Sequence, residues 1–504
     1  MLRGLLRAIG LAAACAWVGL GGPAHAQDRV VVAGGADVTG MNALDVLIIV
    51  PDRSLMDHLS DTLLRWKAPG QIGPWLATSF RNIDNLTWEL TLRQGVKFHN
   101  GERFNAQTVK FFYDTMNDPA VVSPSKTNHT WVTRVEVVDD YKVRLITRQP
   151  YPILPAQLAL AHMMPPAYVK QVGLDGYRRR PIGTGPFKFV EHVPDTRIVM
   201  QANDEWWGGP QRVRTLIYRP IKEDAARAAA LVAGEVDLAM DLPPELLPLV
   251  ERARNVTVQK VLSIRTYVLL MSNLFPDYPT VKREVREAIS YAIDRESLIT
   301  NIMGGLGEPA SFISPTTFGF NPALKPIPYD PARAKRLLAE AGYRNGINVT
   351  LDASHGKYPK DKEIAEAIAG QLTSVGIRTT VKSYEWGVLT KRIFSHQASP
   401  MALIGWGDAN FDPESHNRLT LRSGSTWSQS VDPKLDALLD QIATEMDPEK
   451  RKALIFEEQD YLRQMHPVAY LLRMGVIAGV SRKLDWWKLR ADEKYYFFQN
   501  REVN

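Results

Sequence analysis

The sequence predicts a mixed α/β protein with more than one domain. Residues 88–92 (WELTL) alternate apolar and polar side chains, as in a strand with one buried face. Asp330-Pro331 places an N-cap residue before proline at the first helical position, which is a helix start signal. The chain has 504 residues, which is enough for two or three domains with separate cores.

Further strands are expected on both sides of the centre of the chain. Residues 96–98 are expected to pair with the strand at 88–92 and to end at the Asn100-Gly101 turn. The segment RVEVVDDYKVRLIT (134–147) predicts a hairpin with its bend at the two aspartates. RTYVLLMSN (265–273) is a short apolar run of strand length.

Helices become clearer after residue 281. The segment 331–341 is expected to be helical and to end at Gly342, a second helix begins at Asp361, and a third follows Asp432-Pro433. A strand is expected at 377–381. The apolar side chains of the last two helices recur at helical spacing and form packing surfaces; they are Ile364, Ile368, Leu372 and Val375, and then Leu435, Leu438, Leu439 and Ile442.

The N-terminus has the three parts of a secretory signal peptide. MLRGLLRAIGLAAACAWVGLGGPAHAQ starts with basic residues, continues with an apolar run and ends in a small-x-small site at 24–26. The apolar run is shorter than the roughly 20 residues that a membrane-spanning helix needs. We therefore expect residues 1–26 to be a signal peptide and the mature protein to reach the periplasm. A lipoprotein signal before Cys15 is a poorer match, because three alanines precede the cysteine.

Cys15 is the only cysteine, so we expect the mature chain to contain none. Such a chain has no disulfide, no thiolate metal ligand and no cysteine nucleophile, and its stability must come from core burial. The net charge is +6 at pH 7 with basic residues scattered along the chain, which indicates no nucleic-acid binding. No stretch after the signal peptide is long and apolar enough to span a bilayer.

No local motif indicates catalysis. The ten histidines are dispersed, and neither the zinc-binding HExxH pattern nor the GxSxG nucleophile elbow occurs. The GTGP segment at 183–186 lacks the Gly-Lys-Ser/Thr of a phosphate-binding loop and is better explained as a tight turn before the strand FKFV. We therefore expect no enzyme activity, no catalytic residue and no cofactor.

The segment GWGDANFDPESHN (405–417) gathers a tryptophan, three carboxylates, an asparagine and a histidine. Asp408, Asn410 and Asp412 occupy the first three ligand positions of a calcium loop. The sixth position of such a loop requires glycine, and here it is Pro413, so we expect no metal site. Asp412 is interpreted as part of a structural turn or a helix cap.

Several segments resemble those of the extracytoplasmic solute-binding proteins of peptide and nickel ABC importers (family 5), most of all the dipeptide-binding members. They occur in family order from about residue 30 to the C-terminus. These segments are WELTLRQGVKFHNGERFNAQTVKFFYD, PIGTGPFKFVEH, NDEWWGG, VREAISYAIDRESLI, YDPARAKRLLAEAGY, SYEWGVLTKR and GWGDANFDPES.

This resemblance implies a two-lobed periplasmic-binding-protein fold (type II, large peptide-binding cluster) with an extra third domain. Domain I is expected to be discontinuous (27–66, 181–268 and 477–504), with domain II at 67–180 and domain III, the second ligand-binding lobe, at 269–476. The implied function is to bind a peptide or peptide-like solute between two lobes and deliver it to ABC transporter permease subunits in the inner membrane. We expect a monomer.

The resemblance also implies the ligand contacts. Trp406 ends a strand at the cleft, and Asp408 matches an aspartate that pairs with a ligand's α-ammonium group, in a loop one residue shorter than in the relatives. A carboxylate in a closed cleft of low dielectric gains strongly from a cationic partner. Trp386 and Trp406 match aromatic residues of the pocket wall, with core packing as the alternative. The candidate ligand contacts are Trp406, Asp408, Trp386, His355, Lys357, Asn410 and Trp427.

The segment SHGKYPKDKEIAEAI departs from the dipeptide-binding pattern. His355 stands where those relatives have an arginine that clamps the peptide carboxylate, and Lys357 follows two residues later. Neither side chain offers arginine's bidentate fork, so longer peptides, opines, modified amino acids and non-peptide solutes stay open. Nickel or a nickel chelate is a further alternative, because His355 and His416 could both reach the cleft. An exported peptidase is the alternative from another class.

Overall fold

The computed structural model describes residues 27–46, 50–407 and 410–498. The expected signal peptide and Asp408 lie outside these described residues. Helices and strands alternate along the chain, which confirms the α/β class.

One mixed sheet of eleven strands runs through the molecule. Its order is β15-β14-β16-β12-β17-β11-β1-β10-β9-β8, and β13 pairs with β17 off this path. The apolar run predicted at 265–273 forms the second half of the long strand β12. The strands of this sheet are β1 (Gln27–Gly34), β8 (Phe187–Val193), β9 (Arg197–Ala202), β10 (Val213–Pro220), β11 (Leu238–Ala239), β12 (Val256–Met271), β13 (Gly307–Pro309), β14 (Ile347–Ser354), β15 (Ile377–Tyr384), β16 (Met401–Gly407) and β17 (Val468–Ser481).

A four-stranded antiparallel sheet, β4-β5-β7-β6, stands apart from the large one. The predicted hairpin at 134–147 is confirmed as β6 and β7. The strand predicted at 96–98 is wrong, because only Lys97 makes an isolated bridge and β5 pairs with β4 and β7 instead. Val96 and Phe98 are buried, so their alternation reflects a loop anchored in the core. The remaining strands are β2 (Leu64–Ala68), β3 (Gln71–Pro74), β4 (Ala77–Asn82), β5 (Thr87–Leu92), β6 (Val132–Asp139) and β7 (Lys142–Thr147).

The predicted helix starts are confirmed at α9, α10 and α13, and Asp330 caps α9 by accepting a hydrogen bond from the Arg333 backbone N–H at 2.8 Å. In the described part of the chain, no helix combines the length and the apolar character that a bilayer crossing needs. The α-helices are α1 (Val50–Leu59), α2 (Ala106–Asn117), α3 (Leu154–Leu158), α4 (Pro166–Arg179), α5 (Asp224–Val232), α6 (Leu247–Glu251), α7 (Arg283–Ala292), α8 (Arg295–Asn301), α9 (Pro331–Glu340), α10 (Asp361–Ser374), α11 (Trp386–Phe394), α12 (Pro413–Leu421), α13 (Pro433–Thr444) and α14 (Pro448–Met465). Short 3₁₀ helices span Lys126–Asn128, Pro244–Leu246, Pro279–Val281 and Arg482–Leu484.

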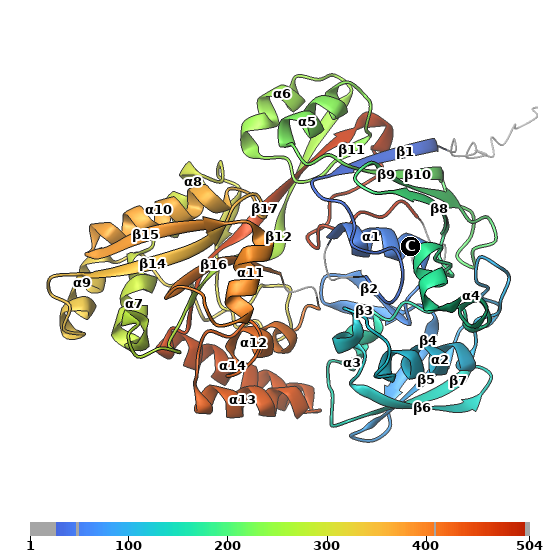
Figure 1. The fold of residues 1–504 in the computed structure, drawn as a ribbon, viewed down its shortest axis with the longest axis horizontal. Coiled ribbons are helices and arrows are strands. Elements are labelled where there is room, and N and C mark those ends of the chain that lie inside the picture. The colour runs from blue at the N-terminus through green and yellow to red at the C-terminus, as the bar shows by residue number, and fades with distance from the viewer. Residues whose placement is uncertain (1–26, 47–49, 408–409, 499–504) are drawn as a thin grey trace, which may run out of the picture.

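The molecule has two lobes joined by two strands (Figure 1). The left-hand lobe holds the elements from α7 to α14, and the right-hand lobe holds those from β1 to α6. β12 and β17 run between them as one antiparallel pair. The register of this pair shifts between Leu262 and Thr266, between the part of β12 on the β11 side and the part that pairs with β16. A shift of this kind bends a strand and increases its twist.

Buried apolar side chains form separate clusters in the two lobes. The largest cluster lies in the left-hand lobe and contains the apolar stripes predicted for α10 and α13. A second cluster surrounds α2, and two more pack on the faces of β1. The domain boundaries expected from the sequence stay a prediction.

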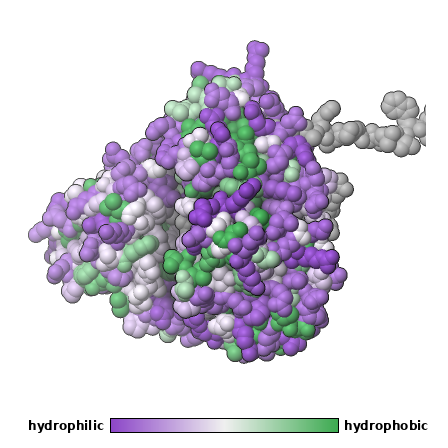
Figure 2. Space-filling view, turned by 45° about the vertical axis from the view of Figure 1, so that its right-hand side comes forward, coloured by the Kyte–Doolittle hydropathy of each residue, from purple (hydrophilic) through white to green (hydrophobic). Residues whose placement is uncertain are grey.

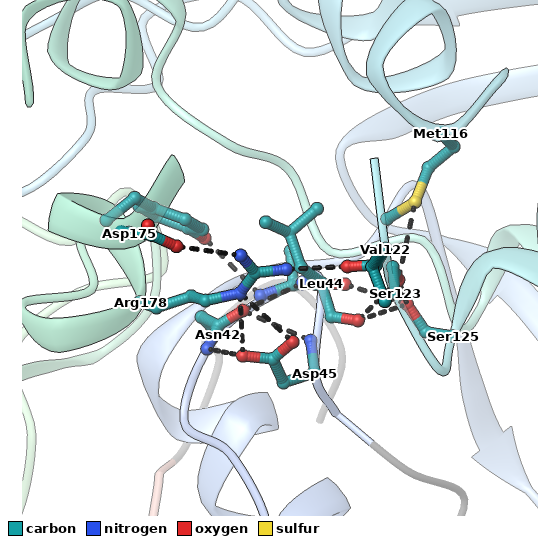
Figure 3. Close-up of polar contacts among 11 residues, drawn as sticks. Asn42, Leu44, Asp45, Met116, Val122, Ser123, Ser125, Asp175 and Arg178 are labelled. Atoms are coloured by element: carbon teal, nitrogen blue, oxygen red, sulfur yellow. Dashed lines mark hydrogen bonds and ion pairs between the residues drawn. The ribbon is translucent and has the colours of Figure 1, made fainter. Parts of the chain in front are cut away.

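A polar network ties the loop after β1 to the unit around α4 (Figure 3). The Arg178 guanidinium donates to Asp45 at 3.2 Å and to the Val122 carbonyl oxygen at 2.6 Å. The Ser125 hydroxyl donates to the Leu44 carbonyl oxygen at 3.0 Å. These bonds satisfy backbone oxygens that no helix or strand pairs, and they hold the loop against the right-hand lobe.

Asp61, just before β2, accepts three indole N–H bonds. The donors are Trp75 at 2.7 Å, Trp206 at 3.2 Å and Trp207 at 2.9 Å. The carboxylate is fully buried, and this burial raises its pKa. It therefore joins the segment NDEWWGG to the start of the small sheets through three donors that have no water to replace them.

We expect Asp61→Asn to lower the free energy of unfolding by at least about 2 kcal/mol at pH 7, because the amide group presents a donor to buried indole N–H groups. Denaturant unfolding followed by tryptophan fluorescence measures this loss. Asp175→Asn is the control: Asp175 pairs with Arg178 at the surface, with its side chain 81% exposed, so the loss should stay below about 1 kcal/mol. Equal losses in both variants would contradict the special role of Asp61.

Candidate ligand-binding site

Three strands of the left-hand lobe end at one edge of the large sheet. β14 pairs in parallel with both β15 and β16, so their carboxyl ends lie together. His355 follows β14, Trp386 follows β15, and Trp406 lies at the end of β16. Ligands of open α/β sheets bind at this kind of edge. The structure therefore brings together three of the residues predicted to contact ligand.

Four aromatic side chains form a continuous surface at this edge, the aromatic wall. Tyr358 contacts Trp386 with ring centroids 5.4 Å apart, and Trp386 stacks on Trp427 at 6.0 Å. Trp427 meets Trp406 edge to face at 5.4 Å. The three tryptophans are half-buried, so part of each residue stays open to further contact. Large rigid rings of this kind bury ligand surface at low cost in conformational entropy.

Gly405 is required for the packing of this wall. A β-carbon at position 405 would lie 2.7 Å from Tyr358 and 2.8 Å from Met474, which is closer than carbon atoms pack. Any side chain there would displace Tyr358. The glycine of the Gly-Trp pair therefore lets the ring sit against β16, while Trp406 itself is held opposite Thr266 of β12.

Asp361 holds the loop that carries Lys357. Its carboxylate accepts backbone N–H bonds from Gly356, Lys357 and Tyr358 at 3.0, 3.0 and 3.2 Å. It also accepts a bond from the Ser354 hydroxyl at 2.8 Å and is 3% exposed. Buried charge-assisted bonds are strong, so the loop is fixed before any ligand arrives. From the sequence, Asp361 was predicted only to begin a helix.

Two cations stand beside the aromatic wall. Lys357 Nζ lies 5.5 Å from the Trp386 ring centroid, and the Arg265 guanidinium lies 5.6 Å from that of Tyr358. Arg265 forms an ion pair with Glu493 at 2.9 Å. Within the described residues, Lys357 Nζ has no hydrogen-bond or ion-pair partner. The cation–π contacts orient both groups, and Lys357 keeps all three donors for another acceptor.

Carboxylates of the right-hand lobe and its C-terminal segment face these cations. Asp241 and Lys357 are both accessible to solvent, yet the protein around them disfavours their charged forms. Desolvation, followed by the charge of Glu493, raises the pKa of Asp241 to about 6. Desolvation, followed by Arg265, lowers the pKa of Lys357. Groups that touch water but are surrounded by protein line a cleft.

The lobes also touch directly. Lys360 Nζ pairs with Glu245 Oε1 at 2.5 Å, and Trp66 meets Phe411 edge to face at 4.8 Å. Figure 2 shows the surface hollowed along the line where the left-hand lobe meets the rest of the molecule. Lys357 and Trp406 belong to the left-hand lobe and Asp241 to the right-hand lobe, and the charges of Lys357 and Asp241 interact across the space between them. This space between the lobes is called the interlobe cleft below.

The remaining predicted residues have different surroundings. His355 is exposed, with Nδ1 3.2 Å from the Ser383 hydroxyl, and Asn410 is buried. The His416 ring lies 5.6 Å from Trp406, and burial lowers its pKa to about 3, so it is neutral at physiological pH. Among the residues described, no three His, Cys, Asp or Glu side chains are arranged to hold a metal ion.

Asp412 has the structural role that was predicted for it. Its carboxylate caps α12 by accepting the Glu414 backbone N–H at 3.0 Å. It also forms a bidentate pair with Arg451 at 2.6 and 2.7 Å. The pair is buried, and it fixes the loop after β16 to α14. Removing either charge alone would leave the other buried and unpaired, with a large loss of stability.

Three further candidate residues of the site were not predicted from the sequence: Arg265, Asp241 and Glu493. Arg265 was the one charged residue at the head of an apolar strand, and that position was a usable signal. Asp241 and Glu493 lie in loops far apart in the chain and meet Arg265 only in the folded protein. Both adopt left-handed backbone conformations, with φ of 55° and 60°, which is uncommon for residues other than glycine.

Two lobes joined by a strand pair, with an aromatic and charged sheet edge between them, define a two-lobed binding protein. Residues 71–428, well over half of the chain, match the family described as bacterial extracellular solute-binding proteins, family 5. The chain belongs to this family, which supplies the solute-binding components of ABC importers. The resemblance inferred from the sequence and the expected type II fold are thereby confirmed.

Individual relatives agree with this assignment. The glutathione-binding protein GsiB of Escherichia coli O1:K1 is 27% identical over 501 residues, covering 94% of each chain. The periplasmic binding protein DppA of Helicobacter pylori, solved with the peptide STSA, is 25% identical with a TM-score of 0.80, covering 94% of this chain and 99% of that one. NikZ of Campylobacter jejuni, solved with Ni(L-His), has the same fold at 22% identity and a TM-score of 0.80, covering 90% and 94%.

Two buried glutamates, Glu414 in α12 and Glu458 in α14, predict a pH dependence of stability. Glu414 is 4% and Glu458 1% exposed, and burial raises their pKa values to about 7 and about 8. Asn417 donates to Glu458 at 2.7 Å. Both groups hold their protons more tightly in the folded than in the unfolded chain. The stability that they contribute is complete below about pH 4.5 and is lost as the pH rises through 7 to 8.

We expect Glu458→Gln to flatten the fall in unfolding free energy between pH 5 and pH 8, by up to about 1.4 kcal/mol per pH unit. The neutral amide fits the site of a protonated carboxyl and does not titrate. Denaturant unfolding at several pH values measures the slope, with Glu457→Gln on the same helix as the control. If the slope stays as steep as in the parent protein, Glu458 does not titrate in this range.

Proposed function

We propose that this protein binds a short peptide, or a peptide-like solute with a free carboxylate, and delivers it to the permease of an ABC importer. The observation that carries this proposal is Lys357: a cation held on the aromatic wall by Asp361, at the interlobe cleft, without a partner in the described residues. A carboxylate supplies the charge and the acceptors that this ammonium group needs. The protein acts by binding, not by catalysis.

The aromatic wall and its neighbours indicate where the other parts of the ligand bind. The apolar part of the solute lies against Trp386, Trp427 and Trp406, and an ammonium group binds Asp408, the residue that follows Gly407 in the sequence. His355 and Asn410 complete the set of expected contacts. Glutathione, for which the Escherichia coli relative is named, and the peptide bound to the Helicobacter pylori protein both belong to this chemical class.

The setting of this function is also proposed. Residues 1–26 direct export to the periplasm and are removed, and the mature protein works as a monomer. Domain I (27–66, 181–268 and 477–504) and domain III (269–476) close on the solute, and domain II (67–180) extends domain I. The closed lobes present one composite surface to the permease in the inner membrane.

Blocked peptides test the two charge contacts separately. We expect Lys357→Met to weaken binding of Ala-Ala-Ala at least tenfold and to leave its C-terminal amide unaffected, because only the free carboxylate uses the ammonium group. Asp408→Asn should weaken Ala-Ala-Ala similarly and leave the N-acetylated peptide unaffected. Isothermal calorimetry measures all of these affinities.

Lys362→Met is the matched control, since Lys362 lies on α10 at the surface and its one ion pair among the described residues is with Glu366, at 3.9 Å. It should bind every peptide as the parent does. If Lys357→Met weakens the amide as much as the free acid, the carboxylate does not lie at Lys357. If the parent binds none of the peptides, and mass spectrometry of protein purified without denaturation finds a non-peptide solute, the proposed function is wrong.

We expect bound Ala-Ala-Ala to reduce the radius of gyration and to raise the melting temperature, because the closed form is the one that contacts both sides of the solute. Lys360→Met removes an ion pair between the lobes and should weaken every peptide equally, by up to about fivefold. Small-angle scattering measures the radius of gyration, thermal unfolding the melting temperature, and isothermal calorimetry the affinities of Lys360→Met. An unchanged radius at saturating peptide would exclude closure of the lobes.

A further inference from the structure

A second pocket opens beside the aromatic wall, on the left-hand lobe. Its volume is about 170 Å³, and it lies between β12, β13, β17 and the segment 309–326. Neither the aromatic wall nor the contacts proposed above use it. The lining side chains that matter for its chemistry are Thr266, Glu308, Ser311, Ser314, Lys325 and Arg473.

The floor of this pocket continues the row of side chains that ends at Trp406. Glu308 of β13 is opposite Arg473 of β17, Arg473 is opposite Thr266 of β12, and Thr266 is opposite Trp406 of β16. All three pairings are antiparallel, so the four side chains point to the same face of the sheet at successive strand spacings. A solute lying on Trp406 therefore has the edge of the pocket at Thr266, one strand away, and Arg473 two strands away.

The pocket has more positive than negative charge. Arg473 is 14% exposed and pairs with Glu308 at 3.0 Å, while the Glu308 side chain is 41% exposed. Arg473 Nε is buried and has no hydrogen-bond partner in the described part of the chain. Lys325 Nζ donates to a backbone carbonyl oxygen, that of Pro322, at 3.0 Å. A half-buried guanidinium with an unused donor favours a carboxylate, which can accept two parallel bonds from it.

We propose that this pocket is a subsite for an acidic side arm of the bound solute, whose carboxylate binds Arg473. The proposal rests on the proposed function and specifies its substrate class: peptides or peptide-like solutes that carry a second carboxylate besides the one at Lys357. A volume several times the roughly 30 Å³ of one water accepts a short carboxyalkyl chain. Glu308, being the more exposed partner, turns toward solvent when the ligand carboxylate arrives.

The alternative is that the pair of Glu308 and Arg473 only fastens β13 to β17. The two accounts predict different signs for two variants of the same ion pair. If the pair is only a fastening, Arg473→Gln and Glu308→Gln remove the same bond and change ligand affinity in the same direction. If Arg473 binds the side arm, Arg473→Gln loses it, whereas Glu308→Gln removes a competing carboxylate.

Calorimetry on the full-length mature protein decides between them, with Ala-Ala-Ala and its variants carrying glutamate or glutamine at each position in turn. At one position, the parent should bind the glutamate peptide at least tenfold more tightly than the glutamine peptide. Arg473→Gln should abolish this preference and leave the glutamine peptide unchanged. Glu308→Gln should increase the preference several-fold. Arg473→Lys, which keeps the charge without the fork, should retain part of it.

The absence of any glutamate preference in the parent would overturn the subsite, as would parallel changes in Arg473→Gln and Glu308→Gln. A loss of all peptides in Arg473→Gln, with an unchanged melting temperature, would also overturn it, because the effect would not be specific to the side arm. The binding of Ala-Ala-Ala tests the proposed function independently of the subsite. If the parent binds Ala-Ala-Ala and Lys357→Met does not, the proposed function stands whatever the outcome at Arg473.

Discussion

The antiparallel pairing of β12 with β17 is the constraint on which the rest of the molecule depends. These two strands supply the hydrogen-bonded connection between the lobes, and each lobe adds its own strands on either side of them. The register shift at Leu262–Thr266 locally relaxes the ladder where the chain passes from one lobe to the other. The two lobes therefore keep separate cores and are joined by a short connection.

Strand β12 also places two side chains beside the regions discussed above, the charged Arg265 and the polar Thr266. Arg265 and Thr266 are neighbours in β12 and point to opposite faces of the sheet, so they meet different members of the aromatic wall. Arg265 meets Tyr358 and Glu493, and Thr266 lies between Trp406 and Arg473. β12 therefore contacts both the aromatic wall and the second pocket.

The left-hand lobe keeps its ligand loops rigid with buried carboxylates. Asp361 binds three successive N–H groups before α10, and Asp412 binds both the start of α12 and Arg451. Each replaces water that a loop of this kind would otherwise need. A candidate ligand contact such as Lys357 therefore stands on a backbone that is already ordered, and ordered groups lose less entropy on binding.

Local patterns determined much of this protein from the sequence alone. Helix caps at Asp330 and Asp432, the hairpin at 134–147 and the family motifs are short-range signals, and the structure or the comparisons confirm them. The motifs also pointed to Trp386, Trp406 and Trp427, which the fold brings into one wall. Asp408 stays a prediction, since it lies outside the described residues.

Only the tertiary structure decided which distant residues meet. Val96 and Phe98 alternate like a strand but anchor a buried loop, because periodicity reports burial and not pairing. Arg265 finds Glu493 more than two hundred residues away, and Arg473 finds Glu308 across a strand pair that no local pattern announces. Sheet order and register place these charges, and both arise from the packing of whole lobes, which a local sequence pattern does not encode.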